Sequence, residues 1–188
     1  RRYVTRVEAN VLAKVADGGD VWHRMGDVGY LDEQDRFWFC GRMAHRVVTA
    51  AGPMYTIPCE AVFLQHPAVF RAALVGVGRR GDQRPVMIVE PWRDQRPRTR
   101  SERMQLLAEL RALAVGSSLT RPINTFLLHP GFPVDIRHNA KIFREQLAVW
   151  AAARLARHGA SAEHADGGPF EFLAEVESAG PGPSSPTT

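Results

Sequence analysis

The sequence predicts an α+β fold, in which a small mixed α/β domain follows the last helix and β-hairpin of another domain. Three observations predict this class. Between residues 47 and 157, strand and helix patterns alternate in the order ββαββαβα, which is typical of a compact domain of the size that folds alone. The hairpin pattern before it is too small to bury its own apolar side. After residue 158 the chain is rich in Ala, Gly, Ser and Pro, and such a tail cannot bury enough apolar surface to become ordered.

The N-terminal elements are a predicted helix and a predicted hairpin. Three valines recur at the i, i+4, i+8 spacing of a helix, and an Asp-Gly-Gly-Asp run is expected to end it. These residues are Val7, Val11, Val15 and the run 17–20. Short strands are expected at residues 21–25 and 37–40, joined through a polar turn at 32–35. The aromatic residues on these strands, Trp22, Trp38 and Phe39, are predicted to lie in a core.

The small domain combines strands with three helices. Strands are expected at residues 47–48, 54–55, 69–77, 85–90 and 123–128. Helices are expected at residues 58–64, 101–116 and 142–157. Pro58 suits a first turn, because its missing N–H would have no helical partner there. Ser101 with Glu102 is the expected cap of the second helix, and Gly116 is expected to end it.

Composition describes a folded protein without a membrane segment. The chain has 188 residues, of which 45% are hydrophobic, and no run approaches the roughly 18 to 20 apolar residues of a membrane span. The first residues lack the apolar core of a signal peptide, so a cytoplasmic location is expected. Cys40 and Cys59 lack metal-ligand spacing and are predicted to be reduced, buried side chains.

The net charge of +4 conceals an asymmetry along the chain. From residue 158 onward there are five acidic residues and no Lys or Arg, so the preceding part holds 24 basic residues against 15 acidic ones. A basic body favours an anionic ligand or simply a solvated surface. Nucleic acid is not favoured, because the arginines are scattered and no basic motif is interleaved with aromatic residues.

Three residues carry side chains suited to binding a nucleotide. Asp27 follows Gly26 in a turn that leaves its carboxylate free. Arg42 directly follows a predicted strand, and Lys141 precedes a predicted helix. Each signal is weak alone, because surface arginines and lysines near helix starts are common. Together they supply a carboxylate for sugar hydroxyls and positive charge for phosphate.

Five motifs in a fixed order resemble the adenylate-forming superfamily of acyl-CoA synthetases, peptide-synthetase adenylation domains and luciferases. They are Met25-Gly26-Asp27, Gly41-Arg42, Gly52, Pro58-Cys59-Glu60 and Lys141. The resemblance runs from His23 to about Leu155. The detailed amino-acid sequence of these motifs looks most like the olefin-biosynthesis branch, whose members are β-lactone synthetases often labelled fatty-acid-CoA ligases.

The resemblance implies a division of the chain into four parts. Residues 1–41 would be the C-terminal end of the large AMP-binding domain, and residues 42–44 the hinge. Residues 45–158 would be the small mobile C-terminal domain, and residues 159–188 an acidic, disordered tail. The family's hinge residue, commonly Asp or Lys, is Ala44 here. This departure puts the usual domain rotation in doubt.

The resemblance also implies roles and ligands. Lys141 would be the catalytic residue, and Asp27 and Arg42 would bind the ribose and phosphate side of ATP. The implied cofactors are ATP and Mg²⁺, and no residue is predicted to bind a metal. His138 is a further candidate because it is close to Lys141 in sequence, although His23, His45 and His138 are better explained by polar packing. Glu60 is expected to cap or pair locally.

The expected activity is ATP-dependent conversion of a long-chain β-hydroxy fatty acid to a β-lactone through an acyl-adenylate. The alternative in the same superfamily is a long-chain fatty acyl-CoA ligase. A non-catalytic binding module is the alternative of another class, because the phosphate-binding loop is absent from these residues and the fragment alone is expected to be inactive. Expected partners are a fatty-acid-type substrate and other enzymes of the same lipid pathway, without nucleic acid or a membrane span.

Overall fold

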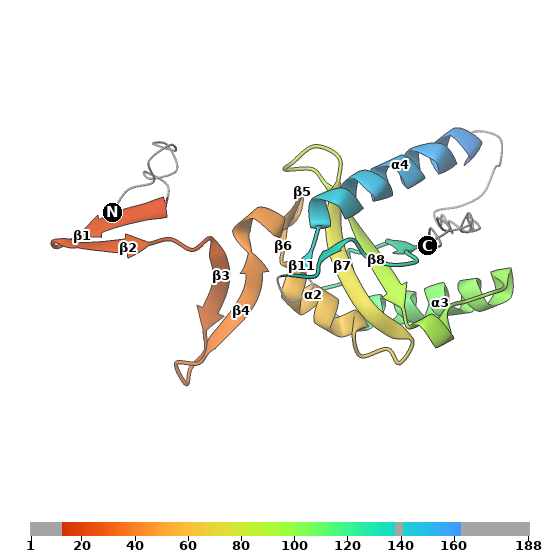
Figure 1. The fold of residues 1–188 in the computed structure, drawn as a ribbon, viewed down its shortest axis with the longest axis horizontal. Helices are drawn as coiled ribbons and strands as arrows, with labels where there is room; N and C mark the ends of the chain where they lie inside the picture. Colours follow the sequence, from red (N-terminus) through yellow and green to blue (C-terminus); the bar gives the residue numbers. More distant parts are fainter. Residues whose placement is uncertain (1–12, 138–140, 163–188) are drawn as a thin grey trace, which may run out of the picture.

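The computed structural model describes residues 13–137 and 141–162. Its fold is mixed α/β: two β-hairpins project to one side of a body in which helices cover a three-stranded sheet (Figure 1). The expected mixture of helices and small sheets is therefore confirmed. The tail predicted to be disordered lies outside the described residues from residue 163 onward.

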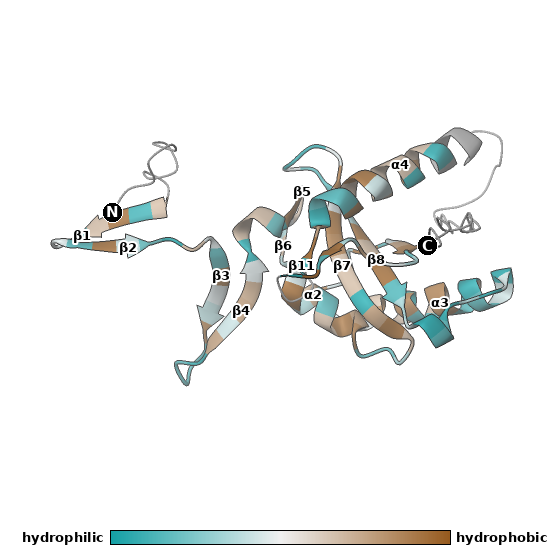
Figure 2. Cartoon of the chain, viewed as in Figure 1, coloured by the Kyte–Doolittle hydropathy of each residue, from teal (hydrophilic) through white to brown (hydrophobic). Residues whose placement is uncertain are grey.

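The central sheet is formed by β7 (Val69–Val77), β8 (Arg84–Pro91) and β9 (Thr125–Leu128). β7 and β8 are antiparallel, and β9 runs parallel to β8. Successive side chains of a strand point to opposite faces, so Leu74 and Ala73 belong to two different core clusters. Because both faces are buried, these strands read as nearly continuous apolar runs, and Figure 2 shows hydrophobic residues along β7 and β8.

Helices cover both faces of this sheet (Figure 1). α2 (Thr56–Phe63) and α3 (Arg100–Gly116) contribute Phe63 and Leu110 to the first core cluster. α4 (Arg144–Ala162) contributes Leu147 and Ala151 to the second. Burying a side chain such as Phe63 or Leu110 completely stabilises the fold by about 1.5–3 kcal/mol each, so the three layers form one stable body.

The helix boundaries differ from the predicted ones at the caps. Thr99 rather than Ser101 caps α3: its Oγ1 accepts a hydrogen bond from the Glu102 N–H, and the Glu102 carboxylate accepts one from the Thr99 N–H, both at 3.1 Å. This reciprocal capping box satisfies two N–H groups that a helix leaves unpaired. Gly116 ends α3 as predicted, and α2 begins two residues before Pro58.

A hairpin between β9 and α4 was absent from the prediction. It pairs β10 (Val134–Asp135) with β11 (Lys141–Ile142). Consequently α4 begins at Arg144, and Lys141 lies on a strand rather than at a helix start. Strands of two residues are too short to show a periodic pattern.

The prediction of a helix reaching Val15 is wrong, because Val15 lies in strand β1. β1 (Lys14–Asp17) pairs with β2 (Asp20–His23) through Gly18 and Gly19, whose φ angles are +54° and +102°. Two glycines with positive φ are typical of a tight hairpin turn. Val7 and Val11 lie outside the described residues.

The second hairpin pairs β3 (Asp27–Leu31) with β4 (Phe37–Arg42). The prediction had the turn at residues 32–35 right but the first strand wrong, because β4 pairs with β3 and not with residues 21–25. A short 3₁₀ helix, η1 (Met43–His45), then leads to the hairpin of β5 (Val47–Thr49) and β6 (Gly52–Met54). This last hairpin agrees with the prediction. A second 3₁₀ turn, η2 (Arg93–Gln95), lies between β8 and α3.

The prediction of core positions for the hairpin aromatics is wrong within the described part of the chain. Trp22 is 65% exposed, and Trp38 and Phe39 are also exposed. Among the described elements, α2 contacts β4 near Gly41 but does not cover these aromatic side chains. Cys59 is buried and Cys40 half-buried, and both are free thiols. None of the described helices is long and apolar enough to span a membrane.

Candidate functional site

Asp27 and Arg42 face each other across the β3–β4 hairpin. The strand register makes them direct partners, and Arg42 Nε lies 2.9 Å from Asp27 Oδ1. Arg42 also donates to the Met25 carbonyl at 2.8 Å. Both side chains remain accessible, with 34% of Asp27 and 52% of Arg42 exposed. The two predicted nucleotide-binding residues therefore form one exposed carboxylate–guanidinium pair.

Glycines fix the backbone on either side of this pair. Gly26 has φ +77° and accepts a hydrogen bond from the Met43 N–H at 2.8 Å. Gly41 is buried with φ +115°, and a Cβ there would lie only 2.5 Å from Thr56 Oγ1 of α2. Only glycine accepts both this backbone conformation and this close approach. The Gly-Asp and Gly-Arg motifs thus have a steric reason as well as a chemical one.

Lys141 is exposed on β11, where its backbone pairs with Asp135. The hairpin that carries it continues with a hydrogen bond from the Phe143 N–H to the Pro133 carbonyl at 2.9 Å. Within residues 13–137 and 141–162, no hydrogen bond or ion pair joins Lys141 to Asp27 or Arg42. His138 lies outside the described residues.

His45 lies in η1 next to the predicted hinge residue Ala44, close to cationic side chains from α4, β11 and β4. Burial lowers the pKa of His45, and the charges of Arg144, Lys141 and Arg42 lower it further, whereas Glu145 raises it. His45 Nε2 lies 3.5 Å from Glu145 Oε1. Arg144 is itself paired with Glu60 and Arg42 with Asp27, so their carboxylate partners offset part of the positive charge near η1.

The local pairing predicted for Glu60 is wrong. Its carboxylate forms a two-pronged ion pair with the guanidinium of Arg144, 84 residues away, with N–O distances of 2.5 and 2.8 Å. Its Oε1 also accepts the Leu74 N–H at 2.8 Å. Burial raises the pKa of Glu60, and Arg144 and the Leu74 N–H counteract part of that rise. No local sequence signal could have found a partner so distant.

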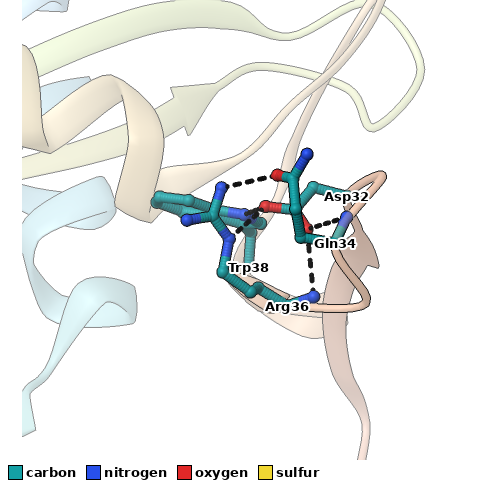
Figure 3. Close-up of polar contacts among 4 residues, drawn as sticks. All are labelled: Asp32, Gln34, Arg36 and Trp38. Carbon is teal, nitrogen blue, oxygen red and sulfur yellow. Dashed lines mark hydrogen bonds and ion pairs between the residues drawn. The ribbon is translucent and has the colours of Figure 1, made fainter.

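Asp32 differs from Asp27 although both lie on the same hairpin. Figure 3 shows its carboxylate accepting hydrogen bonds from the Trp38 indole at 2.7 Å, from the Arg36 side chain and backbone, and from the Gln34 N–H. The indole hydrogen bond is the largest cause that lowers the pKa of Asp32 to about 2. Because local groups occupy both of its oxygens, Asp32 is a turn residue.

The described residues contain no group of three or more His, Cys, Asp or Glu side chains placed to hold a metal ion. The site as it stands combines one exposed ion pair, one exposed lysine and the cationic surroundings of His45. This set can accept hydrogen bonds from hydroxyl groups and can stabilise phosphate charge.

Solved structures share this fold. The amide bond synthetase from Marinactinospora thermotolerans matches with a TM-score of 0.60 and 23% identity over 79% of this chain and 28% of its own. The O-succinylbenzoate coenzyme A synthetase from Bacillus subtilis, in complex with ATP and magnesium ion, matches with a TM-score of 0.59 and 22% identity, covering 78% of this chain and 28% of its own. At these identities the matches establish the fold alone.

The chain belongs to the adenylate-forming superfamily, in which it is homologous to part of a larger enzyme. Within that superfamily it is 52% identical to the olefin beta-lactone synthetase of Stenotrophomonas maltophilia over 158 residues, which is 81% of this chain and 28% of the relative. It is equally identical to the olefin beta-lactone synthetase of Xanthomonas campestris pv. campestris over 145 residues, 77% of this chain and 26% of the relative.

The similarity extends over a shorter stretch to a coenzyme A ligase. A 4-chlorobenzoate–CoA ligase from Arthrobacter is 37% identical over 75 residues, covering 40% of this chain and 14% of the relative. No family model matches the chain. The chain thus spans about a quarter of the length of the olefin beta-lactone synthetases that it matches.

Proposed function

We propose that this chain is the C-terminal part of an ATP-dependent, carboxylate-activating enzyme that converts a long-chain β-hydroxy fatty acid to a β-lactone through an acyl-adenylate. The observation that carries the proposal is the 52% identity to two olefin beta-lactone synthetases over most of this chain. A full-length enzyme would combine this chain with the remaining length of those relatives.

In the first step, a carboxylate oxygen attacks the α-phosphorus of ATP, and the bond to pyrophosphate breaks. Because two anions must meet, the step needs fixed positive charge that is already in place. Lys141 would supply this charge between the entering carboxylate and the phosphate. Its exposure on β11 supports this role, because its ammonium group is open to a ligand.

Asp27 and Arg42 would bind the nucleotide. The Asp27 carboxylate can accept hydrogen bonds from both ribose hydroxyls while its other contact holds Arg42, and the exposed part of the guanidinium would face the ribose or phosphate side. Mg²⁺ would be held chiefly by phosphate oxygens of the bound nucleotide, as this ion prefers. Its charge would help to neutralise the departing pyrophosphate.

In the second step, the β-hydroxyl oxygen of the bound acyl chain attacks the activated carbonyl carbon. The new C–O bond closes the four-membered lactone, AMP leaves with the electron pair of the broken C–O bond, and the hydroxyl proton is lost to solvent or base. The attack is intramolecular, so its effective concentration can be very high once the chain is held correctly. No external thiol is required.

We infer the four-part division given by the sequence. Residues 1–41 would belong to the large domain, residues 42–44 would be the hinge, residues 45–158 would form the small domain, and residues 159–188 would be its tail. The passage of the chain from the projecting β3–β4 hairpin into the body through η1 supports a hinge at Ala44. An alanine there fits a reaction in which no thiol has to enter.

A fatty acyl-CoA ligase is the second candidate, and the similarity to 4-chlorobenzoate–CoA ligase favours it. The test gives the full-length enzyme a β-hydroxy fatty acid, ATP and Mg²⁺, with and without coenzyme A, and identifies products by mass spectrometry. We expect lactone, AMP and pyrophosphate without coenzyme A. A thioester formed only with coenzyme A would establish the ligase instead, and the absence of any pyrophosphate release would favour the non-catalytic binding module.

A further inference from the structure

Lys141 depends for its position on the residues that follow it. Its strand β11 has only two residues, and the neighbouring Ile142 packs against the second core cluster together with Val134. Directly after β11 the chain enters α4 at Arg144. A two-residue strand contributes little stability of its own, so the place where α4 begins largely determines where the Lys141 ammonium lies.

The start of α4 is anchored in the body by the Glu60–Arg144 ion pair. Only 7% of the Glu60 side chain and 13% of the Arg144 side chain are exposed. Glu60 comes from α2, and its Oε1 is also held by the Leu74 N–H of β7. One carboxylate therefore ties α2, the central sheet and the first residue of α4 together, three residues from Lys141.

We propose that Glu60 is a positioning residue for the Lys141 ammonium and acts through Arg144. This inference rests on the proposed function of Lys141. If the Glu60 carboxylate were removed, the Arg144 guanidinium would be buried without its counter-charge, which is strongly unfavourable. Arg144 would then turn toward solvent and move the first turn of α4 and the attached β11. A displacement of about 1 Å at a catalytic group can slow a reaction by roughly 10²-fold.

The nearby Glu145–His45 contact does not replace this anchor. Its His45 Nε2–Glu145 Oε1 distance is 3.5 Å and Glu145 is 75% exposed, so it constrains the helix much less than two short, buried hydrogen bonds do. Glu60 is thus the side chain whose loss should displace Lys141 most.

The test measures carboxylate-dependent ATP–pyrophosphate exchange by the full-length wild-type enzyme and three variants: Glu60→Gln, Lys141→Ala and the double variant. We expect Glu60→Gln to lower kcat about 10- to 100-fold with the KM for ATP little changed. In the Lys141→Ala background, the same substitution should change kcat less than about twofold, because the group that it positions is gone.

A merely structural role predicts a different pattern. If Glu60→Gln only reduced the folded fraction, it would lower the rate by the same factor in both backgrounds, and that result would overturn the proposal. Leu110→Ala is the matched control, because it removes a fully buried side chain from the other core cluster. At a temperature well below unfolding, it should leave kcat unchanged.

Two outcomes separate this proposal from the proposed function. If Lys141→Ala itself leaves the exchange rate intact, the role of Lys141 fails. If Lys141→Ala slows exchange but Glu60→Gln does not, only the positioning role fails. Should Glu60→Gln not fold, Arg144→Lys retains the positive charge but loses the two-pronged geometry; an unchanged rate in that variant would also overturn the proposal.

Discussion

Asp27→Asn should weaken nucleotide binding without weakening the fold. The Asp27–Arg42 pair is exposed at the hairpin edge, and exposed ion pairs contribute about 0–1 kcal/mol to stability. For a chain of this size, 1 kcal/mol corresponds to roughly 2–4 °C in Tm. The melting temperature should therefore fall by no more than about 4 °C.

The effect on ATP should be much larger. A hydrogen bond to a charged group contributes about 1.5–3 kcal/mol, and each 1.4 kcal/mol is tenfold in affinity. If the carboxylate holds the ribose, the KM for ATP should rise about 10- to 150-fold. The assay is ATP–pyrophosphate exchange by the full-length enzyme over a range of ATP concentrations, with differential scanning fluorimetry in parallel.

Asp32→Asn is the matched control, because it removes a carboxylate charge from the same hairpin. The Asp32 carboxylate accepts hydrogen bonds from the side chains of Trp38 and Arg36 and is therefore not expected to bind the nucleotide. It should loosen the turn and leave the KM for ATP unchanged. The reasoning is refuted if both variants raise the KM equally, or if Asp27→Asn leaves it within about threefold of wild type.

Three further predictions concern the buried ion pair, the two thiols and the hairpin turn at Asp32. Glu60→Leu should lower the free energy of unfolding by about 3–5 kcal/mol, because it leaves a buried arginine unpaired; urea denaturation measures this, and a loss below about 1 kcal/mol contradicts it. Burial raises the pKa of the Cys59 thiol to about 12, so at pH 8 a thiol reagent should modify the half-buried Cys40 readily and Cys59 only after unfolding; equal rates would be inconsistent with this. The pKa of Asp32 is lowered to about 2, so its stabilising contacts are fully present above its ordinary pKa near 3.8 and are lost as the pH falls through 2; Trp38 fluorescence should change in that interval, and the Asp32→Asn variant should not show the transition.

The parts of the fold that the sequence predicts well are those with long apolar runs. β7 and β8 are buried on both faces, so their continuous hydrophobic character predicts them directly. Gly116 ends α3 where a helix-breaking residue is expected. The N-terminal pattern misleads, because a spacing of four residues fits both a helical period of 3.6 and a strand period of 2. The Gly18-Gly19 turn, in which both residues have positive φ, favours the hairpin over the helix.

The sequence predicts which residues are candidates for the site, but it does not predict how they are arranged in space. Asp27 and Arg42 were identified by their motifs, whereas their pairing depends on the β3–β4 register, which the prediction had assigned to another strand. The roles of Asp27, Arg42, Lys141, Ala44 and His138 remain predictions. The Glu60–Arg144 pair forms only when α2 and α4 both pack against the edge strand β7, from opposite faces of the sheet. No local sequence pattern reveals this arrangement.

The most direct test of the central claim is the rate of ATP–pyrophosphate exchange by full-length enzyme carrying Lys141→Ala. If Lys141 supplies the positive charge between carboxylate and phosphate, kcat should fall roughly 10²- to 10³-fold, as for the loss of one preorganised electrostatic group. The KM for ATP should change much less, because Asp27 and Arg42 are intact. A variant that retains more than about a tenth of the wild-type rate would contradict the account.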